Sequence, residues 1–171
     1  MRLGTFTLAS FSQMLGTFDH LLGKAAGYPR GGALLTSRLC GDMFPLASQV
    51  RFATQQVVNT LNRLAGADLK GADTDHATLA EAHAHIAGIV AALSATSPEA
   101  FVADDTPVEF DLPNGMAFRM TAEEYVRDWS LPQFYFHVTT AYAILRMEGV
   151  PLGKADYVGY IARHMTAPTA A

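Results

Sequence analysis

Four long segments of the chain carry apolar residues with a helical period, and this feature restricts the fold more than any other. A helix brings residues three and four positions apart onto one face. Residues 7–26, 44–65, 77–95 and 131–148 each contain such an apolar stripe. Because a helix with one apolar face must bury it against a partner, four such helices predict an all-α four-helix bundle.

The ends of these segments carry the expected signals. Gly66 follows the second stripe, where a residue in the left-handed conformation commonly ends a helix. Thr78 and Glu81 have the spacing of a capping box at the start of the third helix. Pro132 lies in the first turn of the fourth helix, and Gly149 follows its end. These signals support the four helices and place their boundaries to within a few residues.

A β-hairpin is predicted between the third and fourth helices, where residues 108–120 read VEFDLPNGMAFRM. A two-residue Asn-Gly loop would place Phe110 opposite Arg119. A three-residue loop over residues 113–115 gives the register Leu112–Met116, Phe110–Phe118 and Val108–Met120. The second register is preferred because it puts the apolar side chains on one face.

The same loop makes a prediction about backbone conformation. Gly115 takes the left-handed position of a bulge-containing hairpin loop, which a side chain with a Cβ adopts less readily. After the hairpin, Thr121 and Glu124 are spaced as a second capping box. We expect them to open a short helix of their own that ends near Trp129, before the fourth helix begins.

Length, charge and cysteine content restrict the class of protein. The 171 residues suit one domain over 1–165, with 166–171 as a mobile tail. A net charge of −4 argues against nucleic acid as a partner. No apolar run reaches the length of about 20 residues that spans a membrane. The single cysteine, Cys40, excludes an intramolecular disulfide and favours a cytoplasmic location.

The composition also bears on assembly. Half of the residues are hydrophobic and only 16% are charged. A chain this apolar has side chains to bury beyond one core, which favours a subunit interface.

Five of the six histidines are not expected to form a site. Helical metal ligands lie three or four residues apart, and no pair of histidines here has that spacing. His83 and His85 are two residues apart, so a helix points them about 200° from each other. We expect His76, His83 and His85 to lie on a solvated flank of the third helix. His20 lies opposite the stripe of its helix, and His164 lies near the chain end.

His137 occupies a different position on its helix. It lies roughly 60–80° from the centre of the apolar stripe, at the edge of the core. A ligand-binding or catalytic imidazole would lie there, as would a buried imidazole that only hydrogen-bonds its neighbours. Spacing alone favours the second interpretation, because buried polar groups nearly always have partners. Gln49 has a similar edge position on the second helix.

Two stretches carry a family resemblance: DMFPLASQV at 42–50 and LPQFYFHVTTAYAILRMEGVPLGKADYVG at 131–159. They resemble a bacterial family of unknown function within the DinB/YfiT-like group of four-helix bundles. With the pattern of the first helix, the resemblance covers nearly the whole chain. It implies a DinB-like bundle with a small hairpin insertion, and a homodimer. The wider group is known for a divalent metal held by three histidines, and some members are thiol-dependent transferases or hydrolases.

Aligned with that group, the chain keeps one of the three metal ligands. His137 falls on the second histidine of an H-x-x-x-H pair, Gln133 falls on the first, and Gln49 falls at or near the histidine of the second helix. A glutamine offers only a neutral carbonyl oxygen, which suits zinc or nickel poorly. The resemblance therefore implies that Gln49, Gln133 and His137 are neighbours in one pocket, joined by hydrogen bonds, with no metal or other cofactor expected.

Two functions from different classes are compatible with these residues. The first is a dimeric bundle that binds a small molecule between helices, or is purely structural. The second is a DinB-like transferase or hydrolase that depends on a divalent metal, zinc or nickel, or on a thiol. In that second case His137 would be the metal ligand or the catalytic base.

Overall fold

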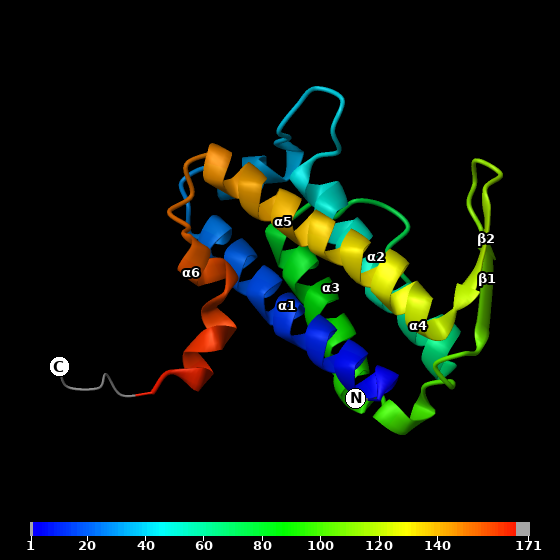
Figure 1. Ribbon diagram of the computed structural model, residues 1–171. Coiled ribbons are helices and arrows are strands. Elements are labelled where there is room, and N and C mark those ends of the chain that lie inside the picture. The colour runs from blue at the N-terminus through cyan, green and yellow to red at the C-terminus, as the bar shows by residue number, and fades with distance from the viewer. Residues whose placement is uncertain (1, 167–171) are drawn as a thin grey trace.

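The computed structural model describes residues 2–166, in which four long helices lie side by side as a bundle (Figure 1). They are α1 (Leu3–Ala26), α2 (Leu46–Ala65), α3 (Leu79–Ala95) and α5 (Leu131–Met147). The all-α prediction with four helices is confirmed, and the boundaries differ by at most four residues. The predicted mobile tail, residues 166–171, lies outside the described residues apart from Thr166.

The largest boundary difference is at the start of α1, four residues earlier than predicted. Leu3 and Gly4 are both buried there. A Cβ on Gly4 would lie 2.4 Å from the carbonyl oxygen of Pro98. Glycine thus lets the first turn of α1 pack directly against the backbone that follows α3. The apolar stripe used for the prediction begins only at Leu8, so it could not show this contact.

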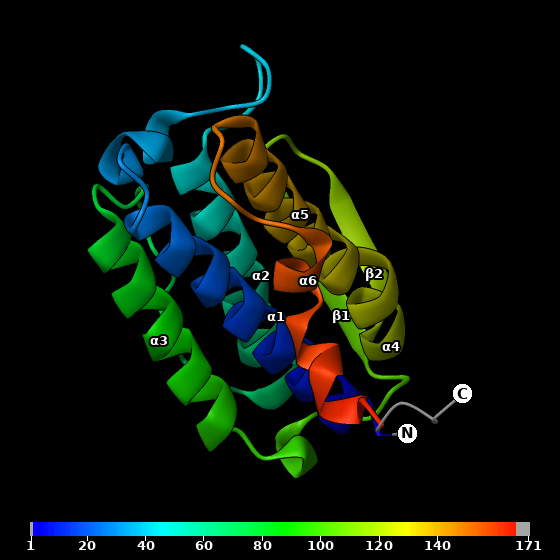
Figure 2. The ribbon, with the colours of Figure 1, turned by 90° about the vertical axis from the view of Figure 1, so that its left-hand side faces the viewer.

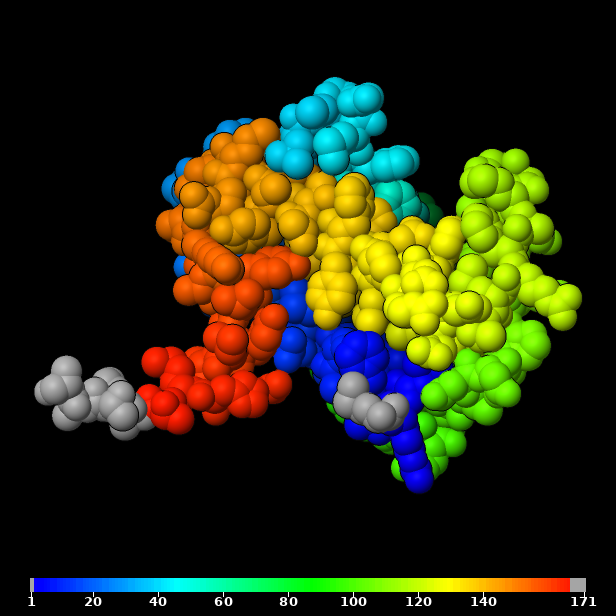
Figure 3. Space-filling model, viewed as in Figure 1, coloured from blue at the N-terminus to red at the C-terminus, as the bar shows by residue number. Residues whose placement is uncertain are grey.

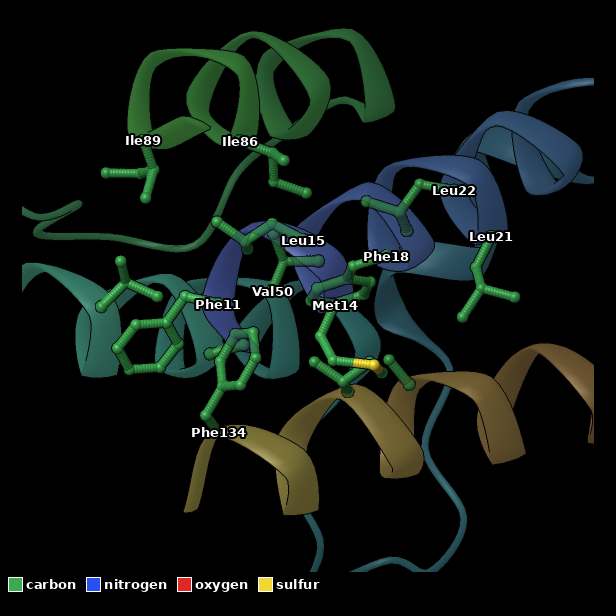
Figure 4. Packing of buried hydrophobic residues seen from close by; sticks show 14 of the residues in the cluster. Phe11, Met14, Leu15, Phe18, Leu21, Leu22, Val50, Ile86, Ile89 and Phe134 are labelled. Carbon is green, nitrogen blue, oxygen red and sulfur yellow. The ribbon is translucent and has the colours of Figure 1, made fainter. Parts of the chain in front are cut away.

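The core fills the space between the four helices. Figure 4 shows Phe11, Met14 and Phe18 of α1 directed between the other helices. The rings of Phe11 and Phe134 meet edge to face, with centroids 5.0 Å apart. Aromatic pairs in this arrangement add to the stabilisation from buried area. α2 packs most extensively against α5, and α1 against α3, and the two pairs face each other across this core (Figure 2).

Shorter elements connect the helices and follow the last of them. Gly66, at φ 64°, ends α2 in the left-handed conformation as predicted. After α5 the chain turns back along α1 (Figure 2). The short elements are η1 (Gly31–Thr36), η2 (Pro98–Ala100), α4 (Ala122–Glu124), η3 (Tyr125–Ser130), α6 (Lys154–Tyr157) and η4 (Gly159–His164).

The predicted hairpin is present with the predicted register. Strands β1 (Pro107–Asp111) and β2 (Ala117–Thr121) are antiparallel, with Phe110 opposite Phe118. Gly115 has φ 86°, and its N–H donates to the carbonyl of Leu112 over 2.9 Å. The three-residue loop and the left-handed Gly115 are thus both confirmed.

The short helix predicted after the hairpin is present and opens with the Thr121–Glu124 capping box, but it does not end near Trp129. α4 continues through η3, a π-helix, directly into α5. Pro132 has no N–H and its ring would clash with the carbonyl four residues earlier in a regular helix. The wider π-helical turn before it accommodates the proline without ending the helix.

No helix between residues 2 and 166 is both long and apolar enough to cross a membrane.

Candidate functional site

The interface between α2 and α5 contains buried polar side chains. Gln49 lies in the first turns of α2 and is only 2% exposed. Its Nε2 donates to the carbonyl oxygen of Phe44 over 2.9 Å. Its Oε1 lies 2.8 Å from Nδ1 of His137, which reaches across from α5. The predicted contact between Gln49 and His137 is therefore present.

These two contacts determine which nitrogen of His137 carries the proton. The carbonyl of Phe44 can only accept a hydrogen bond, so the amide group facing it must be the NH₂ of Gln49. The other amide atom is then the oxygen, which also only accepts, so Nδ1 of His137 must be the donor. In the neutral ring this leaves Nε2 with its lone pair, and Nε2 has no hydrogen-bond partner within residues 2–166.

Aromatic rings surround the imidazole. The ring of Phe52 lies 5.2 Å from that of His137, and the ring of Phe136 lies 5.3 Å from it. Phe44 packs edge to face on Phe52, and both Phe44 and Phe136 are more than half exposed. We call Phe44, Phe52 and Phe136 the aromatic rim.

Burial within this rim lowers the pKa of His137 to about 4. A charged imidazole loses hydration there and gains no carboxylate partner in exchange. His137 is therefore neutral at pH 7. The ring keeps some exposure to solvent, in keeping with the predicted position of His137 at the edge of the core.

Gln133 lies one turn before His137 on the same side of α5. It is half-buried, and no hydrogen bond joins it to Gln49 or His137 within the described chain. Of the three predicted pocket residues, two are in contact and the third lies beside them.

The polar interface extends further than the sequence suggested. The hydroxyls of Thr60 on α2 and Ser130 at the end of η3 are buried and 2.6 Å apart. Gln56, between Gln49 and Thr60 on α2, has a buried Oε1 with no partner among residues 2–166. We call this line of polar residues along α2 and α5 the polar seam. Gln49, Gln56 and Thr60 follow one another at spacings of seven and four, a helical pattern that could have revealed the seam.

The other histidines show where the sequence reasoning was wrong. His83 and His85 do point to different helices, as their spacing predicted: His83 lies 2.6 Å from Asp19 of α1, and His85 lies 3.1 Å from Thr54 of α2. However, His76 and His85 are not solvated. They are half-buried and pack on each other with ring centroids 4.9 Å apart, because the loop before α3 folds over α2.

Comparison with known proteins identifies the family and supports the fold. The family model described as "Domain of unknown function (DUF1993)" matches residues 3–158. The chain belongs to this family. A crystal structure of a DinB family member protein from Shewanella denitrificans is 32% identical, with a TM-score of 0.80. That alignment covers 99% of this chain and 95% of the other, so DUF1993 lies within the DinB-like group. No curated protein matches.

The metal site implied by that wider group does not fit this DUF1993 protein. Within residues 2–166, no three side chains of His, Cys, Asp or Glu are placed to hold a metal ion. Of the aligned positions, only His137 offers a nitrogen lone pair to a metal. Both polar atoms of Gln49 are occupied by Phe44 and His137, and Gln133 offers only a neutral amide oxygen. One imidazole is too few ligands for a tight zinc or nickel site.

Proposed function

We propose that this DUF1993 protein binds a small molecule at the exposed edge of the polar seam, without a tightly held metal. In this proposal, His137 Nε2 accepts a hydrogen bond from the ligand. The observation that carries it is the pair of bonds made by Gln49, which fix Nδ1 as the donor and leave Nε2 as an acceptor. In the wider metal-binding group the same second-nitrogen contact would orient a ligand for a metal.

The surroundings favour a ligand with an apolar or aromatic body. Phe44 and Phe136 are 60% and 57% exposed, and both are linked to His137 through ring contacts. A neutral acceptor beside exposed rings suits a neutral molecule with one donor group, such as a phenol. A carboxylate is disfavoured, because the Arg51 guanidinium, 4.5 Å from the ring of Phe52, is already paired with Asp75.

Acid–base catalysis by His137 is the weaker alternative. A general base works best when its pKa lies near the working pH. The pKa of about 4 makes His137 a poor proton acceptor at pH 7. No side chain in contact with it offsets this, so the binding role is favoured over the transferase or hydrolase role.

The test compares phenol with anisole, which has the same ring but no donor. NMR titration of labelled protein should show saturable shifts at His137 and Gln49 with phenol. Anisole should bind about tenfold more weakly, which corresponds to one hydrogen bond. In His137→Phe the difference between the two probes should vanish. Equal affinity of both probes for the unmodified protein would refute the role of Nε2.

We also propose that the chain is a homodimer in the cytoplasm. Large apolar side chains that are exposed outside the aromatic rim, Phe6, Met147 and Ile161 among them, support the first part, since exposed apolar surface is typical of interfaces. The exposed free Cys40 supports a reducing location. Light scattering at micromolar concentration should give twice the monomer mass of 18.4 kDa. A single species at the monomer mass would contradict the dimer.

A further inference from the structure

A hollow lies away from the polar seam, between α1 and the C-terminal segment. It has a volume of about 470 Å³, within the range of small-molecule sites. Its walls come from one face of α1 and from α6 with η4, the orange-red segment that lies beside the blue helix in Figure 3. None of the polar-seam residues lines this hollow, so a ligand bound in it is independent of the proposed function.

Ionic and hydrogen bonds hold the C-terminal wall in place. Oδ1 of Asp156 lies 2.9 Å from both His20 Nε2 and Lys24 Nζ on α1, and Oδ2 accepts from the N–H of Gly153. These contacts hold the pKa of Asp156 well below its usual range, with the His20 bond as the largest cause. The Thr17 hydroxyl donates to the carbonyl of Tyr157. The wall is thus fixed at several points along α1.

Two glycines keep the hollow open. Gly16 lies on the α1 wall and Gly159 on the C-terminal wall. A Cβ built on either one would meet nothing within 4 Å. The space between the walls is therefore free for another molecule.

The polar groups that line this space, and Arg163, which contacts the lining residue Gln13, have fixed hydrogen-bonding roles. Because the ionised Asp156 only accepts, His20 donates through Nε2, and Nδ1 of the neutral ring is left as an acceptor. Arg163 donates through Nη2 to Oε1 of Gln13 over 3.1 Å, so the Gln13 NH₂ is left as a donor. No carboxylate between residues 2 and 166 pairs with Arg163. The end of the hollow at Gln13 therefore offers a hydrogen-bond donor next to the positive charge of Arg163, and the end at His20 offers an acceptor.

We propose that this hollow binds a small organic acid that carries a hydrogen-bond donor at its far end. The carboxylate of the ligand accepts hydrogen bonds from Arg163 and from the NH₂ of Gln13, and the donor group of the ligand bonds to Nδ1 of His20. The body of the ligand lies over Gly16 and packs against the ring of Tyr160. Gln13 and His20 are two turns apart, about 10.5 Å along α1, a span that suits one six-membered ring with a polar group at each end.

The probe that matches these features is 4-hydroxybenzoate. Titrated into labelled protein, it should give saturable NMR shifts at Gln13, Gly16 and His20. The neutral analogue 4-hydroxybenzamide should bind at least about tenfold more weakly, because it cannot pair with Arg163. Arg163→Gln should weaken 4-hydroxybenzoate binding by about the same factor. His137→Phe should leave it unchanged, which separates this site from the polar seam.

A matched pair of glycine variants tests the location. Gly16→Leu puts a side chain into the hollow and should abolish binding. Gly88→Leu adds the same side chain to α3, where a Cβ also meets nothing within 4 Å, and should leave binding intact. Equal binding by the two variants would overturn the proposal. The absence of saturable shifts at Gln13 and His20 up to millimolar probe would also overturn it, even if Gly16→Leu failed to fold.

Discussion

Histidines from α5 and from α3 are both partly buried against α2, and the two sites give the imidazole different hydrogen-bond partners. His137 of α5 donates to Gln49 and packs against the rings of Phe52 and Phe136. On the other side of the bundle, His85 of α3 meets Thr54 and stacks on His76. Burial lowers the pKa of all three histidines, but Glu81 and Asp75 partly offset this for His76.

The comparison shows that the hydrogen-bond partner, more than the degree of burial, determines how much a buried imidazole contributes to stability. Thr54 already donates its hydroxyl proton to the carbonyls of Val50 and Arg51, so it can only accept from His85. The bond from His85 is therefore only one of those that the Thr54 hydroxyl makes. The amide oxygen of Gln49, in contrast, has His137 as its only donor within the described chain. The His85 site should therefore tolerate loss of its imidazole, and the His137 site should not.

The largest expected effect is that of His137→Leu. This change leaves Oε1 of Gln49 buried without a donor, which costs about 1–3 kcal/mol in the free energy of unfolding. His137→Gln should cost less, because its NH₂ can donate to Gln49. Urea denaturation at pH 7 measures both. Equal losses for the two variants would mean that the hydrogen bond to Gln49 contributes little.

The next effect is on pH dependence. The pKa of His137 is about 4 in the folded protein, below the value of about 6.5 expected when unfolded. Between these values the unfolded chain binds more protons, so the stabilisation present above about pH 6.5 is lost as pH falls towards 4. We expect this loss to be on the order of 1–2 kcal/mol, after discounting for screening of the partly exposed ring.

The variant that isolates this contribution is His137→Gln. Its free energy of unfolding should fall less between pH 7 and pH 4.5 than that of the unmodified protein. Parallel curves for the two proteins would show that His137 titrates normally in the fold.

A smaller effect is expected at the other site. His85→Leu should change the free energy of unfolding at pH 7 by less than about 1 kcal/mol, because Thr54 keeps its bonds to α2. Thermal unfolding of His85→Leu, measured in parallel with that of His137→Leu, compares the two losses of stability directly. A loss for His85→Leu that matched the loss for His137→Leu would break the contrast between the two sites.

The smallest effect concerns metal. Zinc in modest excess should leave the midpoint of thermal unfolding unchanged, since a ligand stabilises only when it binds the folded state tightly. If zinc does stabilise the protein, variants identify the site: loss of the effect in His137→Gln would indicate the metal chemistry of the wider group. Loss in His85→Leu would indicate the stacked pair instead.

The sequence predicted the parts of this fold that depend on local periodicity. The apolar stripes located four helices, and the Phe110–Phe118 register came from placing apolar residues on one face of the hairpin. The Gln49–His137 contact came from aligning the chain with a family, not from the stripe itself. What the sequence could not show depends on non-local packing. The loop before α3 that buries His76, and the C-terminal segment that brings Asp156 to His20, have no periodic signal.

The π-helical stretch Tyr125–Ser130 has a consequence for how this protein can change over evolutionary time. The hairpin joins α5 through this stretch without an intervening loop, so its orientation depends on how the helix winds there. Removing one residue from a regular α-helix turns everything beyond it by about 100°, but a π-helical turn holds about one residue more than an α-helical turn. Deleting the codon for the exposed Asp128 would therefore convert the wide turn towards a regular one and keep the hairpin near its present orientation, with Phe110 close to the Arg63 guanidinium, now 4.8 Å from its ring. A one-residue deletion is thus better tolerated in this stretch than in the regular helices that flank the core.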